Sequence, residues 1–341
     1  KLYNAGLQPL IANLYPEVLL PVSRGTPMIS PLIKWDHSDD WYVTSYKMQK
    51  KITSGERIIE LSLADDDYQY MAGHVIDGRN LLPATGYLAF VWQTVGLMKG
   101  ELYTEISVVF QDVKFLRATT LPKEGIIELT VVVQKGTGRF EIVEGGVAVV
   151  TGYIHTTLNP CMEKMNPKLP EKNESEEMTC KDFYKELRLR GYNYDGLFKG
   201  VKSATTNGSR GTIAWSDNWV AFMDNMLQIQ ILGIDSRSLC VPTGIQKLVI
   251  DTTSHFNQIR AMPKNNNDFP VYAIRKLNLI VSGGVEIRGL KVSVIPRRKR
   301  GGDPVLESYK YVAHRDRAKM SLKEAVHLAT HLSLENHLEM K

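Results

Sequence analysis

The sequence predicts an α+β fold of two similar halves, each a curved antiparallel sheet around one long buried helix. A mostly apolar segment follows Pro83, and a second one spans residues 217–234. Segments that are apolar on every side are expected to form buried helices. Each is followed by runs of β-branched residues at a period of two, which indicate strands. The recurrence of this order indicates two like units.

The first half contains one predicted helix and five predicted strands. Proline has a backbone angle suited to a first helical turn, so the helix is expected to begin at Pro83. One strand precedes this helix and four follow it. The predicted strands span residues 56–63, 105–115, 125–134, 139–146 and 147–158.

The second half has the same order, with strand candidates at 239–251, 269–281 and 285–296 after its helix. Residues 159–178 are rich in proline, lysine and glutamate and have no apolar period, which is typical of a linker. We therefore divide the chain into five parts. They are a linker from a preceding domain (1–30), a first subdomain (31–160), a linker (161–178), a second subdomain (179–298), and a linker with a helix leading to a following domain (299–341).

Composition excludes several classes of function. The 341 residues carry 42 basic and 37 acidic side chains, and a net charge of +5 does not indicate general nucleic-acid binding. Three cysteines leave one thiol over in any disulfide scheme, which favours a reducing compartment. Apolar runs fall short of the roughly 20 residues of a membrane span. With no P-loop, dinucleotide fingerprint or metal-ligand cluster in the sequence, we expect a cytoplasmic protein without a metal or cofactor of its own.

Two ionisable residues stand out, one in each half. His74 precedes Pro83 in a turn-rich stretch, where it is either a loop histidine bonded to a backbone carbonyl or a catalytic base. Asp224 lies on the apolar second helix, where a carboxyl is costly unless it is paired or protonated. Asp217 is better placed to cap that helix. Gln228, four residues after Asp224, shares its helix face.

The motifs around these residues resemble those of β-hydroxyacyl dehydratases. The stretch from His74 through Gly78 to Pro83 fits His-x-x-x-Gly-x-x-x-x-Pro, and Asp224 to Gln228 fits Asp-x-x-x-Gln/His. Their order, one in each half, resembles the double hot-dog dehydratase domain of animal-type (type I) fatty acid synthase and related polyketide synthases. The segments RGTPMISPLIKWDH at 24–37 and SDNWVAFMDNMLQ at 216–228 resemble the fatty acid synthase in particular.

A third motif departs from the family pattern. The family usually has Gly-Tyr-x-Tyr-Gly-Pro-x-Phe, and this chain has Gly-Tyr-Asn-Tyr-Asp-Gly-Leu-Phe at 191–198. Tyr192, Tyr194 and Phe198 remain, whereas Asp195 and Gly196 replace the glycine and proline. The three aromatic residues either line a substrate tunnel or form an ordinary cluster that covers the sheet edge.

The resemblance implies dehydration of β-hydroxyacyl-carrier protein to the trans-2-enoyl product in fatty acid elongation. His74 would take the α-proton, and Asp224, with its pKa raised by an apolar surround, would serve as the acid. Gln228 would orient the carboxyl or the β-hydroxyl. A backbone N–H near Gly78 and the helix start would stabilise the thioester carbonyl. The alternative is that Gly78 only makes a tight turn, and the two roles are compatible. Pro83 would shape the loop.

The implied partners follow from the same resemblance. The acyl group would arrive on the phosphopantetheine arm of an acyl carrier protein, and no cofactor would be needed in this domain. An acyltransferase would lie on the N-terminal side and a pseudo-methyltransferase or reductase on the C-terminal side, in a parent protein expected to be a homodimer. The alternatives are a polyketide synthase dehydratase, a hot-dog acyl thioesterase that activates water with a carboxylate, and a non-catalytic scaffold.

Overall fold

A computed structural model describes residues 5–7, 10, 13, 55–165, 167, 169, 176–234, 236–263, 267–297 and 319–337. The motif at 24–37 and most of the linkers expected at 1–30 and 299–341 lie outside the described residues, whereas ten of the eighteen residues of the linker at 161–178 are described. One compact unit ends at Arg297, and helix α7 (Leu322–Asn336) belongs to a second unit that begins at Arg298. The expected boundary followed residue 298, one position later.

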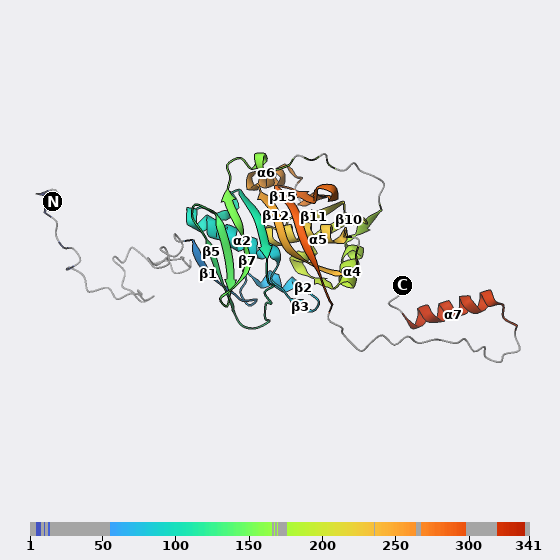
Figure 1. Cartoon of the computed structure of the whole chain (residues 1–341). Helices are drawn as coiled ribbons and strands as arrows, with labels where there is room; N and C mark the ends of the chain where they lie inside the picture. The colour runs from blue at the N-terminus through green and yellow to red at the C-terminus, as the bar shows by residue number, and fades with distance from the viewer. Residues whose placement is uncertain are drawn as a thin grey trace, which may run out of the picture. The chain divides into compact units, whose positions relative to one another are not determined.

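In the first half, helix α2 lies among five long strands (Figure 1). Two short strands and two 3-10 helices complete it. The elements are β1 (Glu56–Leu61), η3 (Gln69–Gly73), β2 (His74–Ile76), β3 (Arg79–Asn80), α2 (Ala84–Lys99), η4 (Tyr103–Glu105), β4 (Val108–Phe115), β5 (Ile127–Val133), β6 (Arg139–Glu144) and β7 (Val147–Thr156).

The second half repeats this plan around helix α5. Its elements are α3 (Pro160–Glu163), β8 (Glu177–Thr179), α4 (Cys180–Arg190), β9 (Tyr192–Tyr194), η5 (Gly196–Lys199), β10 (Val201–Thr205), β11 (Arg210–Ala214), α5 (Trp219–Leu232), β12 (Leu239–Ile250), α6 (Thr252–Ala261), β13 (Asp268–Ile274), η6 (Arg275–Leu277), β14 (Leu279–Ser282) and β15 (Val285–Ile295). Helix α7 spans Leu322–Asn336 and starts with a capping box formed by Ser321 and Glu324.

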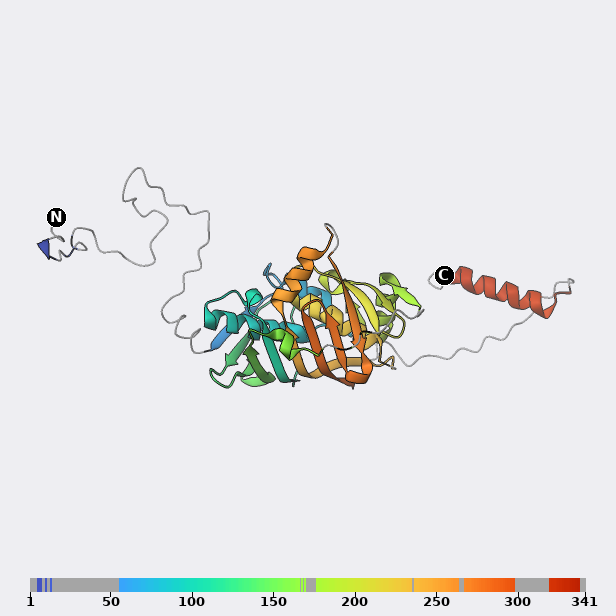
Figure 2. The ribbon, with the colours of Figure 1, turned by 90° about the horizontal axis from the view of Figure 1, so that it is seen from above.

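One antiparallel sheet of twelve strands runs through both halves, in the order β1-β5-β6-β7-β4-β12-β15-β14-β13-β11-β10-β8. The halves join where β4 pairs with β12, from Val108 opposite Ile250 to Lys114 opposite Gly244. Figure 2 shows the blue-green elements of the first half beside the yellow-orange elements of the second. The expected α+β double hot-dog fold is therefore confirmed, with its two sheets merged into one.

Helices α2 and α5 form the core because most of their side chains are apolar and buried. Trp92 of α2 is buried, and its indole N–H donates to the Ile106 carbonyl at 3.0 Å. Trp92 also packs edge-on against Trp219, the first residue of α5, with ring centroids 5.3 Å apart. Fully burying one such large side chain stabilises a fold by about 1.5–3 kcal/mol. The two helices therefore pack against each other in the core.

The local sequence signals located most of these elements. The helix expected after Pro83 is α2, and it ends at Gly100 in the left-handed conformation, with φ 71°. The single strand expected at 269–281 was wrong. The chain instead forms β13 and β14, because residues 275–277 make a 3-10 turn and Asn278 takes a left-handed φ of 45°.

Candidate active site

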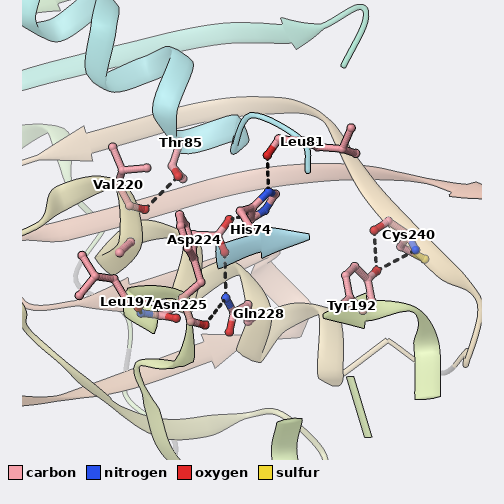
Figure 3. A network of polar contacts seen from close by, with 12 residues as sticks. His74, Leu81, Thr85, Tyr192, Leu197, Val220, Asp224, Asn225, Gln228 and Cys240 are labelled. Carbon is pink, nitrogen blue, oxygen red and sulfur yellow. Dashed lines mark hydrogen bonds and ion pairs between the residues drawn. The ribbon is translucent and has the colours of Figure 1, made fainter. Parts of the chain in front are cut away.

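His74 begins strand β2 and is buried. Its Nδ1 lies 2.7 Å from the carbonyl oxygen of Leu81 (Figure 3). A carbonyl oxygen can only accept, so Nδ1 carries a hydrogen and donates it. In the neutral ring, Nε2 is then left with a free lone pair. The backbone bond therefore prepares His74 to accept a proton at Nε2, which combines the two roles that the sequence left open.

Asp224 and Gln228 lie one turn apart on α5, and both are buried. The amide Nε2 of Gln228 donates to Oδ2 of Asp224 at 2.8 Å (Figure 3). The expectation that Asp217 caps this helix was wrong. The cap is Asn218, whose side-chain oxygen accepts from the Ala221 N–H at 2.9 Å, while Asp217 stands just before it with a left-handed φ of 55°.

His74 of the first half and Asp224 of the second half face each other where the two halves meet. Nε2 of His74 lies 3.6 Å from Oδ1 of Asp224. This separation is longer than a direct hydrogen bond. Helix α2 also binds the second half near this pair, because the Thr85 hydroxyl donates to the Val220 carbonyl of α5 at 2.9 Å. The arrangement presents a proton acceptor and a carboxyl oxygen to the same space.

A pocket with an empty volume of about 820 Å³, its open mouth included, contains this pair. Most of the wall is apolar and comes from both halves. The lining residues are His74, Ile76, Leu81, Leu82, Ala84, Tyr87, Phe115, Leu116, Arg117, Ala118, Tyr192, Tyr194, Asp224, Leu227, Gln228, Ile231, Cys240, Val241, Pro242 and Thr243. An apolar pocket with a few converging polar groups is typical of a small-molecule site.

Gly78 makes a turn and does not line this pocket. It follows Asp77 in the two-residue loop between β2 and β3, and both residues have left-handed backbones, with φ of 72° and 49°. An Asp-Gly pair with this geometry is the preferred tight hairpin turn. Gly78 therefore makes the tight turn that the sequence left open, and an oxyanion role for a backbone N–H near it stays a prediction. Pro83 directly precedes α2, and Ala84, the first helical residue, does line the pocket.

Both tyrosines of the third motif, Tyr192 and Tyr194, line the pocket, but their hydroxyls differ in their hydrogen bonds. The Tyr192 hydroxyl donates to the Cys240 carbonyl at 2.5 Å and accepts from the Cys240 N–H at 2.8 Å. The Tyr194 hydroxyl has no hydrogen-bond partner among the described residues. Burial, followed by the charge of Asp224, raises the pKa of Tyr194 well above its ordinary value. The Tyr194 hydroxyl therefore remains a neutral donor.

Strand β9 brings this motif to the histidine. His74 pairs with Tyr194 and Ile76 with Tyr192 in the small β3-β2-β9 sheet. The change to Asp195 and Gly196 keeps Tyr194 at the pocket wall. Phe198 is different, because it is fully buried outside the pocket lining and packs on the His74 ring with centroids 5.1 Å apart. Phe198 thus packs on the His74 ring and does not line this pocket, and a substrate-tunnel role for it stays a prediction.

Sequence reasoning missed two contacts at this site. One is the Leu81 carbonyl, which carries no side-chain signal because any residue supplies the same group. The other is Tyr184 of α4, whose hydroxyl lies 3.1 Å from Oε1 of Gln228. Nothing in the local pattern of α4 distinguishes this tyrosine from one that packs in the core.

Across the described residues, no three His, Cys, Asp or Glu side chains are grouped so that they could hold a metal ion. No helix in the same part of the chain is long and apolar enough to cross a membrane.

Comparison with known proteins gives the same fold. Residues 47–144 match the family model described as polyketide synthase dehydratase domain. The highly reducing polyketide synthase verA of Penicillium polonicum is 21% identical over 274 residues, and milA of Cordyceps militaris is 24% identical over 289 residues. These matches cover 65% and 64% of this chain, which spans only about a tenth of each relative, 10% and 11%.

Solved structures of dehydratase domains superpose on the chain. The dehydratase domain from the CurF module of curacin polyketide synthase aligns with a TM-score of 0.53 and 19% identity, covering 71% of this chain and 93% of that one. A trans-AT polyketide synthase dehydratase domain from Brevibacillus brevis aligns with a TM-score of 0.53 and 12% identity, covering 71% and 94%. The chain therefore has the double hot-dog fold of these domains, and its first half matches the dehydratase family model.

Proposed function

We propose that this chain is a dehydratase that removes water from a β-hydroxyacyl thioester. The observation that carries the proposal is the position of His74 Nε2 and Asp224 Oδ1, 3.6 Å apart at one largely apolar pocket. Elimination of water needs one group that accepts the α-proton and one that assists the leaving hydroxyl. The residues present supply one of each.

The reaction balances with these two side chains alone. Nε2 of His74 takes the α-proton, and the electron pair of the broken C–H bond forms the double bond between the α and β carbons. The bond from the β carbon to its hydroxyl breaks, and the oxygen takes the proton of the Asp224 carboxyl and leaves as water. General acid–base assistance of this kind contributes about 10² to 10⁴-fold to a rate.

Charge that develops on the thioester carbonyl requires a hydrogen-bond donor. Ala84 is the first residue of α2, and no side chain caps this helix. The first N–H groups of a helix lack partners within the helix and carry its positive dipole end. Because Ala84 lines the pocket, we place the carbonyl of the thioester against the start of α2.

The substrate would be delivered on the phosphopantetheine arm of an acyl carrier protein, without a further cofactor. The multidomain polyketide synthases among the relatives support a chain that works beside other synthase domains. Carrier protein, neighbouring domains, a homodimeric parent and a cytoplasmic location are parts of this proposal. The matches favour a polyketide synthase dehydratase over the fatty acid synthase dehydratase that the sequence motifs suggested.

Conversion of a β-hydroxybutyryl pantetheine thioester tests the proposal. The wild-type chain should form the enoyl thioester, whereas His74→Ala and Asp224→Asn should not. His155→Ala, at an exposed histidine of β7, is the matched control and should retain activity. Release of free thiol would instead identify a thioesterase. Inactivity on both pantetheine and carrier-protein substrates would identify a scaffold.

The same assay, run on a series of β-hydroxyacyl substrates, distinguishes a polyketide synthase dehydratase from a fatty acid synthase dehydratase. Fatty acid elongation produces saturated, unbranched acyl tails of increasing length, so its dehydratase must accept the whole series. We expect this chain to discriminate among β-hydroxyacyl substrates by length and by methyl branching at the α carbon. Equal kcat/KM along an unbranched series, with rejection of the branched substrates, would favour the fatty acid synthase.

A further inference from the structure

Helix α4 places the hydroxyl of Tyr184 next to Gln228, the residue that binds the Asp224 carboxyl. Tyr184 does not line the pocket that contains His74 and Asp224. The hydroxyl of Tyr184 lies 3.1 Å from Oε1 of Gln228 and 3.1 Å from the carbonyl oxygen of Phe198. It also accepts the Val201 N–H at 2.9 Å. Burial raises the pKa of Tyr184 above its ordinary value, so the phenol keeps its proton. Tyr184 therefore has one hydrogen to donate and two candidate acceptors.

The orientation of the Gln228 amide is determined by its neighbours. Its Nε2 lies 3.0 Å from the Phe198 carbonyl, an oxygen that can only accept. The NH₂ group must therefore stand on this side, where it also reaches Oδ2 of Asp224 at 2.8 Å. Both of its hydrogens are then in use. Oε1, the other polar atom of the amide, needs a donor, because Gln228 is fully buried.

Tyr184 is the donor that meets this need. The Phe198 carbonyl already receives a hydrogen from Gln228, and Oε1 has no other donor among the described residues. Hydrogen bonds linked in a chain polarise one another, so donation to Oε1 strengthens the N–H groups on the other side of the amide. The chain of donors runs from Tyr184 through Gln228 to Oδ2 of Asp224.

The direction of these hydrogen bonds determines which oxygen of Asp224 carries the proton in the acid form. Oδ2 is occupied as an acceptor of the Gln228 N–H. The proton is therefore held on Oδ1, the oxygen that faces Nε2 of His74. A carboxyl that is free to place its proton on either oxygen would present the acid to the leaving hydroxyl for only part of the time.

We propose that Tyr184 is a positioning residue for the dehydration, acting through Gln228 to hold the Asp224 proton on the oxygen that faces the substrate. The inference rests on the proposed dehydratase function. Because Tyr184 lies outside the pocket lining, its loss should lower kcat and leave KM unchanged.

The test is a double-mutant cycle with steady-state kinetics on the β-hydroxybutyryl thioester. Tyr184→Phe should lower kcat about tenfold, the factor that corresponds to roughly one hydrogen bond, with KM within twofold. In a Gln228→Leu background, the same change should cost less than about twofold, because the group through which Tyr184 acts is gone. Tyr103→Phe removes another partly buried tyrosine hydroxyl, outside the pocket, and should leave kcat unchanged.

Two unnatural residues at position 184 keep the test independent of folding defects. 4-Fluorophenylalanine fills the space of the hydroxyl without donating, and it should reproduce the loss of kcat. 3-Fluorotyrosine keeps the donor and should restore kcat to within about twofold of the wild type.

Each result is decisive for one claim. An unchanged kcat without the donor, or equal losses in the wild-type and Gln228→Leu backgrounds, would overturn the role of Tyr184 alone. An inactive wild type would overturn the proposed function, and this inference with it.

Discussion

Nε2 of His74 lies 3.6 Å from Oδ1 of Asp224, although one residue opens a short strand in the first half and the other lies within a helix of the second. Each is oriented from behind by a hydrogen bond that leaves the atom facing its counterpart free: the Leu81 carbonyl for the imidazole, and the Gln228 amide for the carboxyl. Catalysis should accordingly depend on both residues at once.

Removal of either member of the pair should lower kcat by about 10² to 10⁴-fold. His74→Ala and Asp224→Asn together should cost little more than the worse single change, because residues that act as a unit are not additive. Single-turnover rates of enoyl formation measure this effect. Additive losses would show that the two side chains act in separate steps.

The two pocket tyrosines should respond differently to loss of their hydroxyls. Tyr192→Phe leaves the buried Cys240 N–H and carbonyl without their partner, so the free energy of unfolding should fall by about 1–3 kcal/mol. Tyr194→Phe should leave stability nearly unchanged and lower kcat/KM about tenfold, because it removes a neutral donor at the pocket wall. Urea unfolding and kinetics on both variants make the comparison. Equal effects of the two changes would contradict it.

Gly73→Ala should disturb the site through the backbone. A Cβ at Gly73 would stand 2.2 Å from the carbonyl oxygen of Asp195, at the point where the Asp195 N–H donates to the Gly73 carbonyl at 2.8 Å. The clash would separate β2 from β9 and displace His74. We expect lower kcat and a lower melting temperature.

Gly86→Ala is the matched control for that change. A Cβ at Gly86 of α2 would meet its nearest neighbour, a Leu82 methyl group, at 3.4 Å, which is ordinary contact. A Gly73→Ala enzyme with wild-type kcat would show that the β2–β9 pairing does not position the histidine.

His255 should make the fold sensitive to acid. This histidine of α6 is fully buried against Trp215, Trp219 and Phe269, and burial lowers its pKa to about 4. Below the unfolded-state value of about 6.5, the unfolded chain binds a proton that the folded chain refuses. Stability should therefore be fully present above pH 6.5 and fall by about 3 kcal/mol on the way to pH 4.

Urea unfolding between pH 8 and pH 4 measures this loss. His255→Phe keeps an aromatic ring in the cluster but cannot titrate, so its stability should fall less over the same range. A variant with the same pH dependence as the wild type would assign the acid sensitivity to other groups.

Most of the main elements could be predicted because their signals are local. Apolar side chains on every face mark α2 and α5, and the alternation of β-branched residues marks the strands that cover them. The strands β10 and β11, of five residues each, were not predicted, and neither were β2, β3, β8 and β9, which have two or three residues each, too few for a period. In β2, β3 and β9 the pairing is decided by distant segments. They form only where β2 meets the chain segment after α4.

The motif residues were found from the sequence, but their roles were only partly separated. Gly78 and Phe198 lie in motifs with the reactive residues, yet the structure assigns one to a turn and the other to packing beneath the histidine. The spacing of a motif indicates that its residues belong to one site. It does not tell which of them face the pocket.

The sequence by itself determined the two helix-centred halves, the location of both central helices, and the histidine and aspartate available for proton transfer, because periodicity and side-chain chemistry can be read locally. Only the tertiary structure decided that the pairing of β4 with β12 merges the halves into one sheet. It also decided that Nδ1 of His74 donates to the Leu81 carbonyl and that the Tyr184 hydroxyl contacts Gln228. The physical reason is that these features depend on backbone groups, which every residue shares, and on contacts between segments far apart in the chain.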